Sequence, residues 1–349
     1  MPIETPRLID LHTDWLLQYA PETNLYTSEM AEYAKTVLSQ AEGYLGATAA
    51  AVLAVYRDAE DWARHADPWA AAGDLITRIE AEFPGRILMG PEDLDRWRDD
   101  PDGLAWALIG IEGFDFLIRS SADLDRLPRF WERGVRLFQP VYGAASVLGG
   151  SSLPDDDRGL TELGRAFLDT LLSLASQARR PMLDLAHLNP RTASEVLAWF
   201  EIDSERADRV IPVYSHGAVF HEEFARPRAC TIENLRRLRA LGGVIGFSVS
   251  PPFYATPDAI RRSIEQTAEV PFQGRTGLEG IAIGTDFLGV DATIPGLGNA
   301  PEVIAWVTST FPPETARQIL RENGERLVER SVGGRTRLEC EVRKSPGLQ

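Results

Sequence analysis

The sequence predicts an α/β protein whose fold is a closed (β/α)8 barrel, the TIM barrel. Short apolar runs recur eight times along the 349 residues, and stretches with helical spacing of apolar residues lie between them. The runs are apolar at successive positions, which is typical of strands that are buried on both faces. Eight such strands alternating with helices favour a closed parallel barrel over an open sheet.

The strand-like runs extend from the N-terminus to residue 286. They cover residues 8–14, 47–56, 107–112, 134–142, 181–187, 210–216, 243–250 and 280–286. Helical spacing is clearest over residues 28–40, 161–178, 231–241 and 313–329. The segment 142–159 is rich in Gly, Ser and Asp, and is predicted to be a lid or substrate loop.

No linker or repeat of fixed period divides the chain. We therefore expect residues 1–332 to form a single barrel domain, which is within the usual size of this architecture. Residues 333–349 lose the periodicity and are predicted to form a surface tail.

The charge balance excludes two classes of partner. The chain has 36 basic and 52 acidic residues, a net charge of −16, whereas nucleic acids and anionic membranes are bound by basic surfaces. No apolar run is long enough to span a bilayer, and the N-terminus shows no signal peptide. Cys230 and Cys340 are too few for a disulfide framework or a Cys-type zinc site, so a reducing, cytoplasmic location is expected.

Histidines and carboxylates gather where the apolar runs end. Asp10, His12 and Asp14 alternate along the first run, so their side chains are expected on one face. The later runs end in Glu112, His187, His216 and Asp286. In a (β/α)8 barrel the C-terminal ends of the strands meet at one face, which holds the active site. Imidazole and carboxylate groups that converge there are typical ligands of divalent metal ions.

Each of these residues also has a structural explanation. A lone histidine is more often a satisfied core residue, and His12 and Asp14 could cap the loop and helix that follow them. However, three of the five histidines end predicted strands, as do three carboxylates. One zinc ion needs three protein ligands and a water, so six candidates favour two metal ions that share a carboxylate.

The remaining histidines, together with Asp184 and Ser215, are not expected to be metal ligands. His65 is expected on the surface, and His221 in a loop after the sixth run. Asp184 lies deeper in its strand than the histidine that follows, and is expected to support a metal ligand. Ser215 precedes His216, and because neighbours on a strand point to opposite faces, no nucleophile–base pair is expected.

Taken in this order, the strand ends resemble those of the membrane (renal) dipeptidase family of zinc metallopeptidases, peptidase family M19. The matching motifs are His12-x-Asp14, Ile111-Glu112-Gly113, Gly134-Val135-Arg136, Gly159-Leu160-Thr161-Glu162-Leu163-Gly164, Asp184-Leu185-Ala186-His187, Ser215-His216, Gly242-Gly243-Val244-Ile245-Gly246, Gly284-Thr285-Asp286-Phe287 and Asn323-x-x-Arg326. His-x-Asp alone would be a weak signal, but nine motifs in register are specific. The resemblance implies an amidohydrolase-like barrel of the metal-dependent hydrolase type.

The resemblance also implies two zinc ions per chain. His12 and Asp14 would hold one ion, and His187 and His216 would hold the other. Glu112 would bridge the two ions.

The implied activity is that of a dinuclear zinc dipeptidase, acting on dipeptides that include those with a D-residue at the C-terminal position. A metal-bridging hydroxide would attack the peptide carbonyl, and Asp286 would act as the acid/base. Arg228 would bind the carboxylate of this small-molecule substrate. The sequence leaves open whether the chain forms a homodimer.

Two positions depart from the family pattern on the substrate side. Tyr142 stands where the fourth strand of the family usually ends in a histidine, and can donate a hydrogen bond through its hydroxyl. Asp286-Phe287-Leu288-Gly289 replaces the usual Asp-Phe-Asp-Gly and lacks its second acid. These changes keep open a related metal-dependent amidohydrolase that acts on another small amide or a lactone. A metal-binding protein without catalysis is a third alternative, which the retained Asp286 disfavours.

Overall fold

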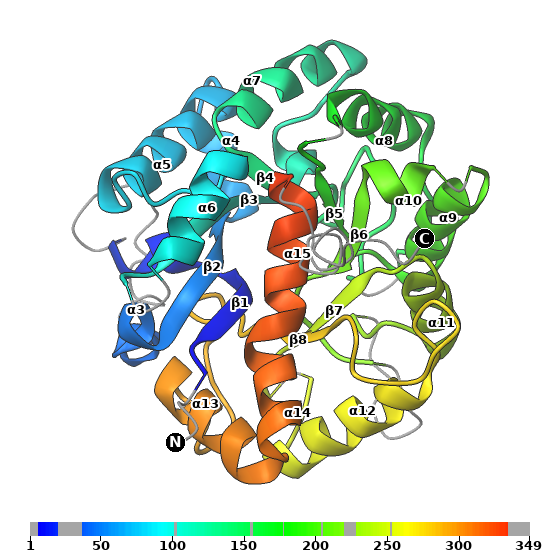
Figure 1. Cartoon of the computed structure of the whole chain (residues 1–349). Coiled ribbons are helices and arrows are strands. Elements are labelled where there is room, and N and C mark those ends of the chain that lie inside the picture. The colour runs from blue at the N-terminus through cyan, green and yellow to red at the C-terminus, as the bar shows by residue number, and fades with distance from the viewer. Residues whose placement is uncertain are drawn as a thin grey trace, which may run out of the picture.

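The computed structural model describes residues 6–19, 37–100, 103–153, 156–176, 178–203, 205–219, 228–251 and 253–333. Within these residues, eight parallel strands close into a barrel in the order of the sequence (Figure 1). They are β1 (Leu8–Thr13), β2 (Thr48–Val55), β3 (Trp106–Glu112), β4 (Val135–Gln139), β5 (Met182–Asp184), β6 (Ile211–Tyr214), β7 (Val244–Phe247) and β8 (Ile281–Ile283). Asp10 of β1 pairs with Ile283 of β8, which closes the barrel and confirms the predicted fold.

The strands are buried along their whole length because apolar side chains cover both of their faces. Alternate residues belong to two separate clusters. Val52 and Leu108 belong to the cluster inside the barrel, whereas Leu53 and Ile109 belong to the larger cluster under the surrounding helices. The continuous apolar runs in the sequence therefore serve two cores at once.

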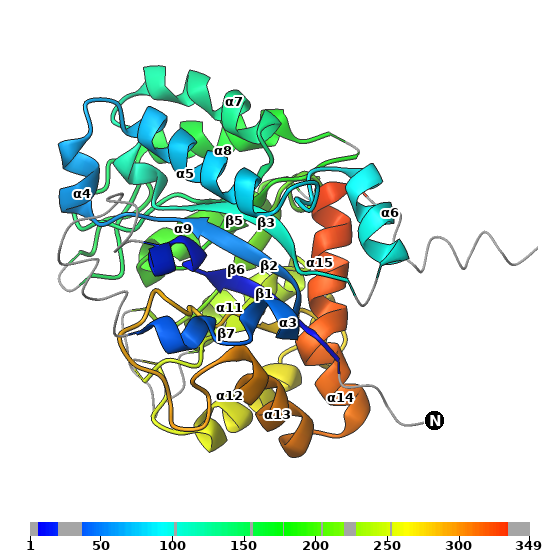
Figure 2. The same ribbon diagram turned by 90° about the vertical axis from the view of Figure 1, so that its left-hand side faces the viewer.

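Helices surround the barrel in both views (Figures 1 and 2). They are α3 (Tyr44–Ala47), α4 (Ala59–Arg64), α5 (Pro68–Glu82), α6 (Pro91–Asp99), α7 (Leu127–Glu132), α8 (Glu162–Leu174), α9 (Pro190–Glu201), α10 (Arg206–Arg209), α11 (Ile232–Ala240), α12 (Pro257–Glu269), α13 (Ala300–Thr310), α14 (Pro313–Arg317) and α15 (Asn323–Val332). Thr161 and Thr231 cap α8 and α11, because each side chain accepts a hydrogen bond from an N–H of the first turn. None of the helices in the described ranges is long and apolar enough to cross a membrane.

The predicted helices over residues 161–178, 231–241 and 313–329 are confirmed, although the first of them, α8, ends at Leu174. The last of them contains a π-helical segment (Gln318–Glu322) between α14 and α15. Of the helix predicted over residues 28–40, only residues 37–40 are described, and a short 3-10 helix (Leu38–Ala41) forms there instead. The predicted tail from residue 333 lies outside the described residues, except for Gly333.

All eight strands lie where they were predicted, but several end earlier. β5 and β8 end three residues before His187 and Asp286, respectively. His187 has a φ of 64° and Asp286 a φ of 61°, and an extended strand does not allow these values. The chain therefore turns sharply before each of these side chains.

Helix α15 lies across the end of the barrel where the strands begin (Figure 2). The Asn323 side chain donates to the carbonyls of Leu278, at 2.7 Å, and Ile281, at 2.6 Å. Arg326 donates to the Asn323 oxygen at 2.5 Å, so the motif Asn323-x-x-Arg326 anchors this helix beneath β8. The opposite end of the barrel, where the strands finish, holds the polar residues described next.

Candidate metal centre and active site

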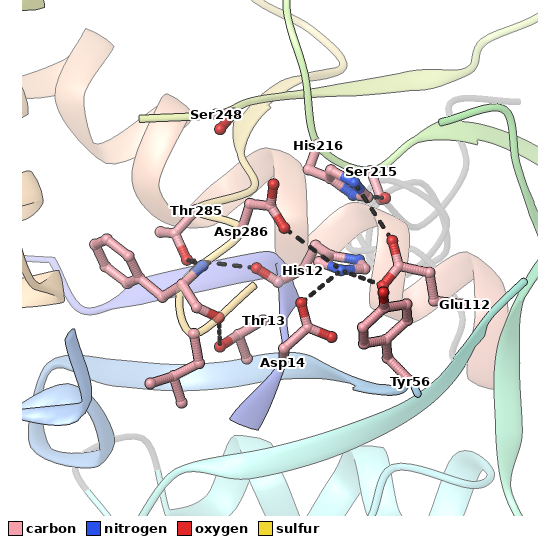
Figure 3. A network of polar contacts seen from close by, with 12 residues as sticks. His12, Thr13, Asp14, Tyr56, Glu112, Ser215, His216, Ser248, Thr285 and Asp286 are labelled. Carbon is pink, nitrogen blue, oxygen red and sulfur yellow. Dashed lines mark hydrogen bonds and ion pairs between the residues drawn. The ribbon is translucent and has the colours of Figure 1, made fainter. Parts of the chain in front are cut away.

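The polar strand ends meet in one cavity at the C-terminal end of the barrel. The cavity has a volume of about 480 Å³, and its lining includes Asp14, Glu112, Tyr142, His187, Arg228 and Asp286. His12 and His216 contact this lining, with their ring centroids 3.9 Å apart (Figure 3). The structure thus brings together all eight residues that were expected to bind metal ions or substrate or to transfer a proton.

Glu112, the last residue of β3, lies between two groups of ligand atoms. Its Oε2 is 3.5 Å from His12 Nε2. Its Oε1 is 3.1 Å from His187 Nε2 and 3.7 Å from His216 Nε2. Asp14 belongs to the first group, because its Oδ2 is 3.9 Å from His12 Nε2. One carboxylate therefore presents one oxygen to each group, as a ligand shared by two metal ions would.

The surroundings of His12 fit a bound cation. Its side chain is fully buried, yet among the described residues neither ring nitrogen has a hydrogen-bond partner, nor does Asp14 Oδ1. Such unpartnered buried atoms cost free energy. Burial lowers the pKa of His12, but the carboxylates of Glu112, Asp14 and Asp286 outweigh burial and raise this pKa to about 10. The carboxylates thus stabilise positive charge at this point, and the donor atoms are those of a divalent-metal site.

His187 and His216 are available as neutral ligands. Burial lowers the pKa of His187 to about 4, and the Arg228 charge acts in the same direction. Burial and the charge of His12 lower the pKa of His216 well below its ordinary value. Both imidazoles are therefore uncharged at neutral pH, as metal binding requires.

A chain of hydrogen bonds orients the His216 ring. The Ser215 hydroxyl donates to Asp184 Oδ2 at 2.5 Å, and its oxygen lies 2.8 Å from His216 Nδ1. Because the Ser215 hydroxyl has one proton and donates it in the hydrogen bond to Asp184, its oxygen can only accept a hydrogen bond from His216. This places the imidazole proton on Nδ1 and leaves the Nε2 lone pair facing Glu112.

This chain corrects the expectation that Ser215 and His216 point apart. Strand β6 ends at Tyr214, so the alternation of a strand no longer holds at the next two residues. The pair still cannot act as nucleophile and base, because Ser215 is fully buried and contacts the ring nitrogen that faces away from Glu112.

Asp10 fixes the chain after β8 by hydrogen bonds, as Asp184 fixes the chain after β6. Its carboxylate accepts hydrogen bonds from the Thr285 N–H at 2.9 Å, the Thr285 hydroxyl at 2.6 Å and the Tyr44 hydroxyl at 2.7 Å. Asp10 therefore fixes the residue before Asp286. It does not line the cavity, although it shares β1 with His12.

Two candidate residues have strained backbones. Non-glycine residues rarely adopt the positive φ of His187 and Asp286, which costs about 1–2 kcal/mol per residue. Hydrogen bonds hold both positions: the Asp286 N–H donates to the His12 carbonyl at 3.1 Å, and the Ser152 N–H donates to the His187 carbonyl at 2.7 Å. Strain of this kind is concentrated at functional sites.

Gly289 preserves space beside two carboxylates. A Cβ at this position would lie 1.9 Å from Asp14 Oδ2 and 2.8 Å from Asp286 Oδ1. Any other residue would therefore fill the region between these oxygens. The glycine that ends the motif Asp286-Phe287-Leu288-Gly289 is required by this close approach.

Asp286 has the acidity of a proton carrier. Burial raises the pKa of Asp286 to about 6, although His12 and Arg228 oppose the increase. Its Oδ1 lies 3.9 Å from His12 Nε2. A carboxyl group whose pKa is close to neutral can both accept and donate a proton during a reaction.

Tyr142 forms a pair with Tyr56, a cavity residue that the sequence did not reveal. Tyr56 donates to the Tyr142 hydroxyl at 3.2 Å, and the Tyr142 ring stacks on His187 with centroids 4.3 Å apart. Because Tyr142 accepts from Tyr56, its own proton remains available to another group. Burial raises the pKa of both tyrosines, so both stay protonated at neutral pH. Tyr56 directly follows β2 and ends the second predicted run, residues 47–56, so the convergence of the strand ends was the signal that could have found it.

Arg228 contacts the candidate metal ligands directly. Its Nη2 donates to His187 Nε2 at 2.7 Å, and its carbonyl accepts a hydrogen bond from the Tyr214 hydroxyl. One lone pair cannot accept this hydrogen bond and bind a metal ion at once. Metal binding through His187 Nε2 therefore requires the guanidinium to move away from this nitrogen.

The other sequence candidates lie elsewhere. His65 caps the end of α4 and does not line the cavity, and His221 lies outside the described residues. Of the described residues in the predicted loop 142–159, only Tyr142 lines the cavity. The Asn189 side chain ties this loop to α9 by donating to the Arg158 carbonyl at 2.8 Å.

Comparison with known proteins identifies the family. Residues 3–333 match the family model described as membrane dipeptidase, peptidase family M19. The chain belongs to this family. M19 proteins are metallo-dipeptidases, so this protein is a metal-dependent hydrolase of peptide bonds. The resemblance seen in the sequence is thereby confirmed.

Individual relatives found by sequence are distant, at 26% identity. An uncharacterised protein encoded in the pqqA 5′ region of Klebsiella pneumoniae is 26% identical over 239 residues, covering 63% of this chain and 78% of the relative. The dipeptidase verJ of Clonostachys rogersoniana is 26% identical over 265 residues, which cover 74% of this chain and 61% of verJ.

Solved M19 structures share the fold. The dipeptidase AC superposes with a TM-score of 0.70 at 20% identity, over 95% of this chain and all of that chain (100%). A metallopeptidase from Rhodobacter sphaeroides, liganded with a phosphinate mimic of L-Ala-D-Ala, gives a TM-score of 0.69 at 18% identity, over 94% of this chain and 100% of that chain.

Proposed function

We propose that this M19 protein is a dinuclear zinc dipeptidase. The position of Glu112 carries the proposal, because its two oxygens face two groups of buried ligand atoms. His12 and Asp14 would hold one ion, and His187 and His216 would hold the other. Histidine and carboxylate ligands suit zinc. Bound zinc would supply Lewis acidity, which lowers the pKa of water and polarises the substrate carbonyl.

Asp286 is assigned the proton transfer. With a pKa of about 6 it is mostly ionised at neutral pH, so it can accept a proton from the attacking water. Once protonated, it can give this proton to the leaving amine. The hydrogen bond from its N–H to the His12 carbonyl holds the carboxyl beside the ligand group.

Arg228 and Tyr142 are assigned to the substrate. Arg228 would bind the C-terminal carboxylate by charge-assisted hydrogen bonds after leaving His187. Tyr142, oriented by Tyr56, would donate to the carbonyl oxygen as negative charge builds on it. We include dipeptides with a C-terminal D-residue because the Rhodobacter sphaeroides metallopeptidase is liganded with a mimic of L-Ala-D-Ala.

A related activity on another small amide or a lactone is the second candidate. Tyr142 favours it, because a phenol cannot carry positive charge near neutral pH as an imidazole can. The carbonyl oxygen would then be stabilised differently from that in family members with a histidine. Metal binding without catalysis is disfavoured by Asp286, since a structural metal site has no use for a buried carboxyl with a raised pKa.

A substrate panel separates these functions. Zinc-loaded protein is assayed against dipeptides with an L- or D-residue at the C-terminal position, their C-terminal amides, simple amides and lactones. We expect hydrolysis of dipeptides, with kcat/KM falling when the C-terminal carboxylate is amidated. Cleavage of amides or lactones but no dipeptide would establish the second candidate. A protein that retains its metal but cleaves none of these compounds would contradict both enzymatic proposals.

A further inference from the structure

A second cavity lies at the end of the barrel opposite the metal centre. Its volume is about 440 Å³, within the range of small-molecule sites. It is bordered by Val244 at the start of β7, by Gly280 just before β8, and by α15. Figure 1 shows α15 beside these strands. Among the described residues, none lines both this cavity and the active-site cavity.

Positive charge dominates this cavity. Among the described residues that line it are four arginines, Arg180, Arg275, Arg326 and Arg330, and two acids, Asp208 and Glu279. The whole chain has a net charge of −16, so this local excess runs against the overall charge. Among the described residues, the active-site cavity shows the reverse balance, with one arginine, Arg228, among several carboxylates.

Nearby acids neutralise only part of this positive charge: Arg326 pairs with Glu322 at 3.8 Å and donates to the Asn323 side chain at 2.5 Å. Within the described part of the chain, Arg180 and Arg275 make no ion pair and no side-chain hydrogen bond. Arg330 donates one hydrogen bond, to the Gly242 carbonyl at 2.6 Å, which leaves further donors on this side chain. Burial lowers the pKa of Arg330 to about 10, and repulsion from Arg180 acts in the same direction, while Asp208 opposes the decrease. A bound anion would relieve this repulsion.

A third cavity, of about 490 Å³, provides a contrast. It contains Arg126, Arg129 and Arg133. There Arg126 pairs with Asp67 at 3.0 Å and Arg133 with Glu80 at 2.8 Å. Two of its three arginines are thus paired with acids, whereas among the described residues only Arg326 of the four in the second cavity has an acidic partner, Glu322 at 3.8 Å.

We propose that the cavity formed by Arg180, Arg275, Arg326 and Arg330 binds a small oxyanion with at least two negative charges, such as a phosphate or a dicarboxylate group. The planar guanidinium matches both groups through paired N–H donors. A large polyanion such as nucleic acid would be repelled by the acidic chain, whereas a small anion experiences mainly the local field of the cavity.

Calorimetric titration tests the proposal. Inorganic phosphate, sulfate and succinate are titrated into the zinc-loaded protein at about 0.15 M salt, the physiological ionic strength. Phosphate and sulfate present tetrahedral groups and succinate presents carboxylates, so their ranking distinguishes the two chemistries. We expect one anion per chain, bound about 10–100-fold more weakly by the Arg180→Gln/Arg275→Gln double variant, with dipeptide hydrolysis unchanged.

Two controls make the result decisive. Arg126→Gln removes a paired arginine from the third cavity and should leave anion affinity unchanged. Glu112→Gln disturbs the metal centre, so anion binding that disappears in this variant belongs to the metal ions and overturns the proposal. Equal anion affinity in the wild type and in the double variant would also overturn it, as would the absence of binding. None of these results bears on dipeptide hydrolysis, so the two proposals fail independently.

Discussion

Asp286 combines three features that rarely coincide in one residue: burial, a positive φ and a carboxylate oxygen 3.9 Å from His12 Nε2. We predict that Asp286→Asn keeps nearly normal zinc content but lowers kcat by about 10²–10⁴, the usual contribution of a positioned acid/base. Asparagine suits this test because it tolerates a positive φ better than most residues. Wild-type turnover would remove the proton-transfer role, and a large loss of zinc would show that Asp286 is a ligand.

The acidity of Asp286 also predicts a pH dependence. The carboxylate must be ionised to accept a proton, so kcat/KM should fall as the pH falls through its pKa. Burial raises this pKa to about 6, while bound cations would favour the ionised form. We therefore expect an acidic limb at pH 6 or below that is absent in Asp286→Asn. If kcat/KM fell at the same acidic pH in the wild type and in Asp286→Asn, another titrating group would be responsible.

The Tyr56–Tyr142 pair makes a prediction about two residues at once. Tyr142→Phe removes the donor and should lower kcat by about 10²–10³ without loss of zinc, as for other oxyanion donors. Tyr56→Phe removes only the hydrogen bond that orients Tyr142, so we expect a smaller loss. The double variant should be no slower than Tyr142→Phe alone, because Tyr56 acts through Tyr142. Additive losses would show that Tyr56 contacts the substrate independently.

At the scale of elements, the turn after β8 shapes the metal centre. Gly289→Ala would place a methyl group 1.9 Å from Asp14 Oδ2, so either the turn or the carboxylate must move. We predict a marked loss of zinc and of activity, measured by elemental analysis and dipeptide hydrolysis. Gly46→Ala in α3 is the matched control, because nothing lies within 4 Å of a Cβ there. Normal zinc content in Gly289→Ala would place the metal ions away from Asp14.

Residues at the ends of the neighbouring strands β5 and β6 hold His216, one of the two histidines expected to bind the second metal ion. Ser215→Ala removes the hydroxyl between Asp184 and His216, so the imidazole proton is no longer held on Nδ1. Loss of such a supporting contact typically weakens metal affinity by about 10–100-fold. Ser173→Ala, a change at an exposed hydroxyl on α8, is the control. Unchanged zinc affinity in Ser215→Ala would mean that Asp184 and Ser215 serve only packing.

The sequence predicted the elements better than it predicted their ends. Apolar runs identify β5 and β8 because burial on both faces leaves a continuous pattern. His187 and Asp286 then leave the strand through positive φ values, which no pattern of alternation encodes. His12 and Glu112 could be singled out because strand ends of a barrel converge by geometry. Tyr56 also ends a predicted run, but its hydrogen bond with Tyr142, 86 residues away in the chain, is not encoded by any pattern of residues.

At the scale of the molecule, bound metal should contribute to stability. Without it, the barrel mouth holds several buried carboxylates and the unpartnered nitrogens of His12. A ligand at a hundredfold excess over its Kd stabilises the folded state by about 2.7 kcal/mol. We predict that chelation lowers Tm, that zinc restores it, and that Glu112→Gln shows a smaller shift. An unchanged Tm would mean that the positive charge of protonated His12 already compensates the negative charge of the surrounding carboxylates in the metal-free protein.

A zinc titration tests the shared carboxylate most directly. Chelator-treated wild type and Glu112→Gln are titrated with zinc by calorimetry while dipeptide hydrolysis is followed in parallel. Two ions per wild-type chain are predicted, together with weaker binding of both ions in the variant, because one carboxylate faces both groups of ligands. A single ion in the wild type, or a variant that loses one ion and binds the other normally, would contradict the dinuclear centre.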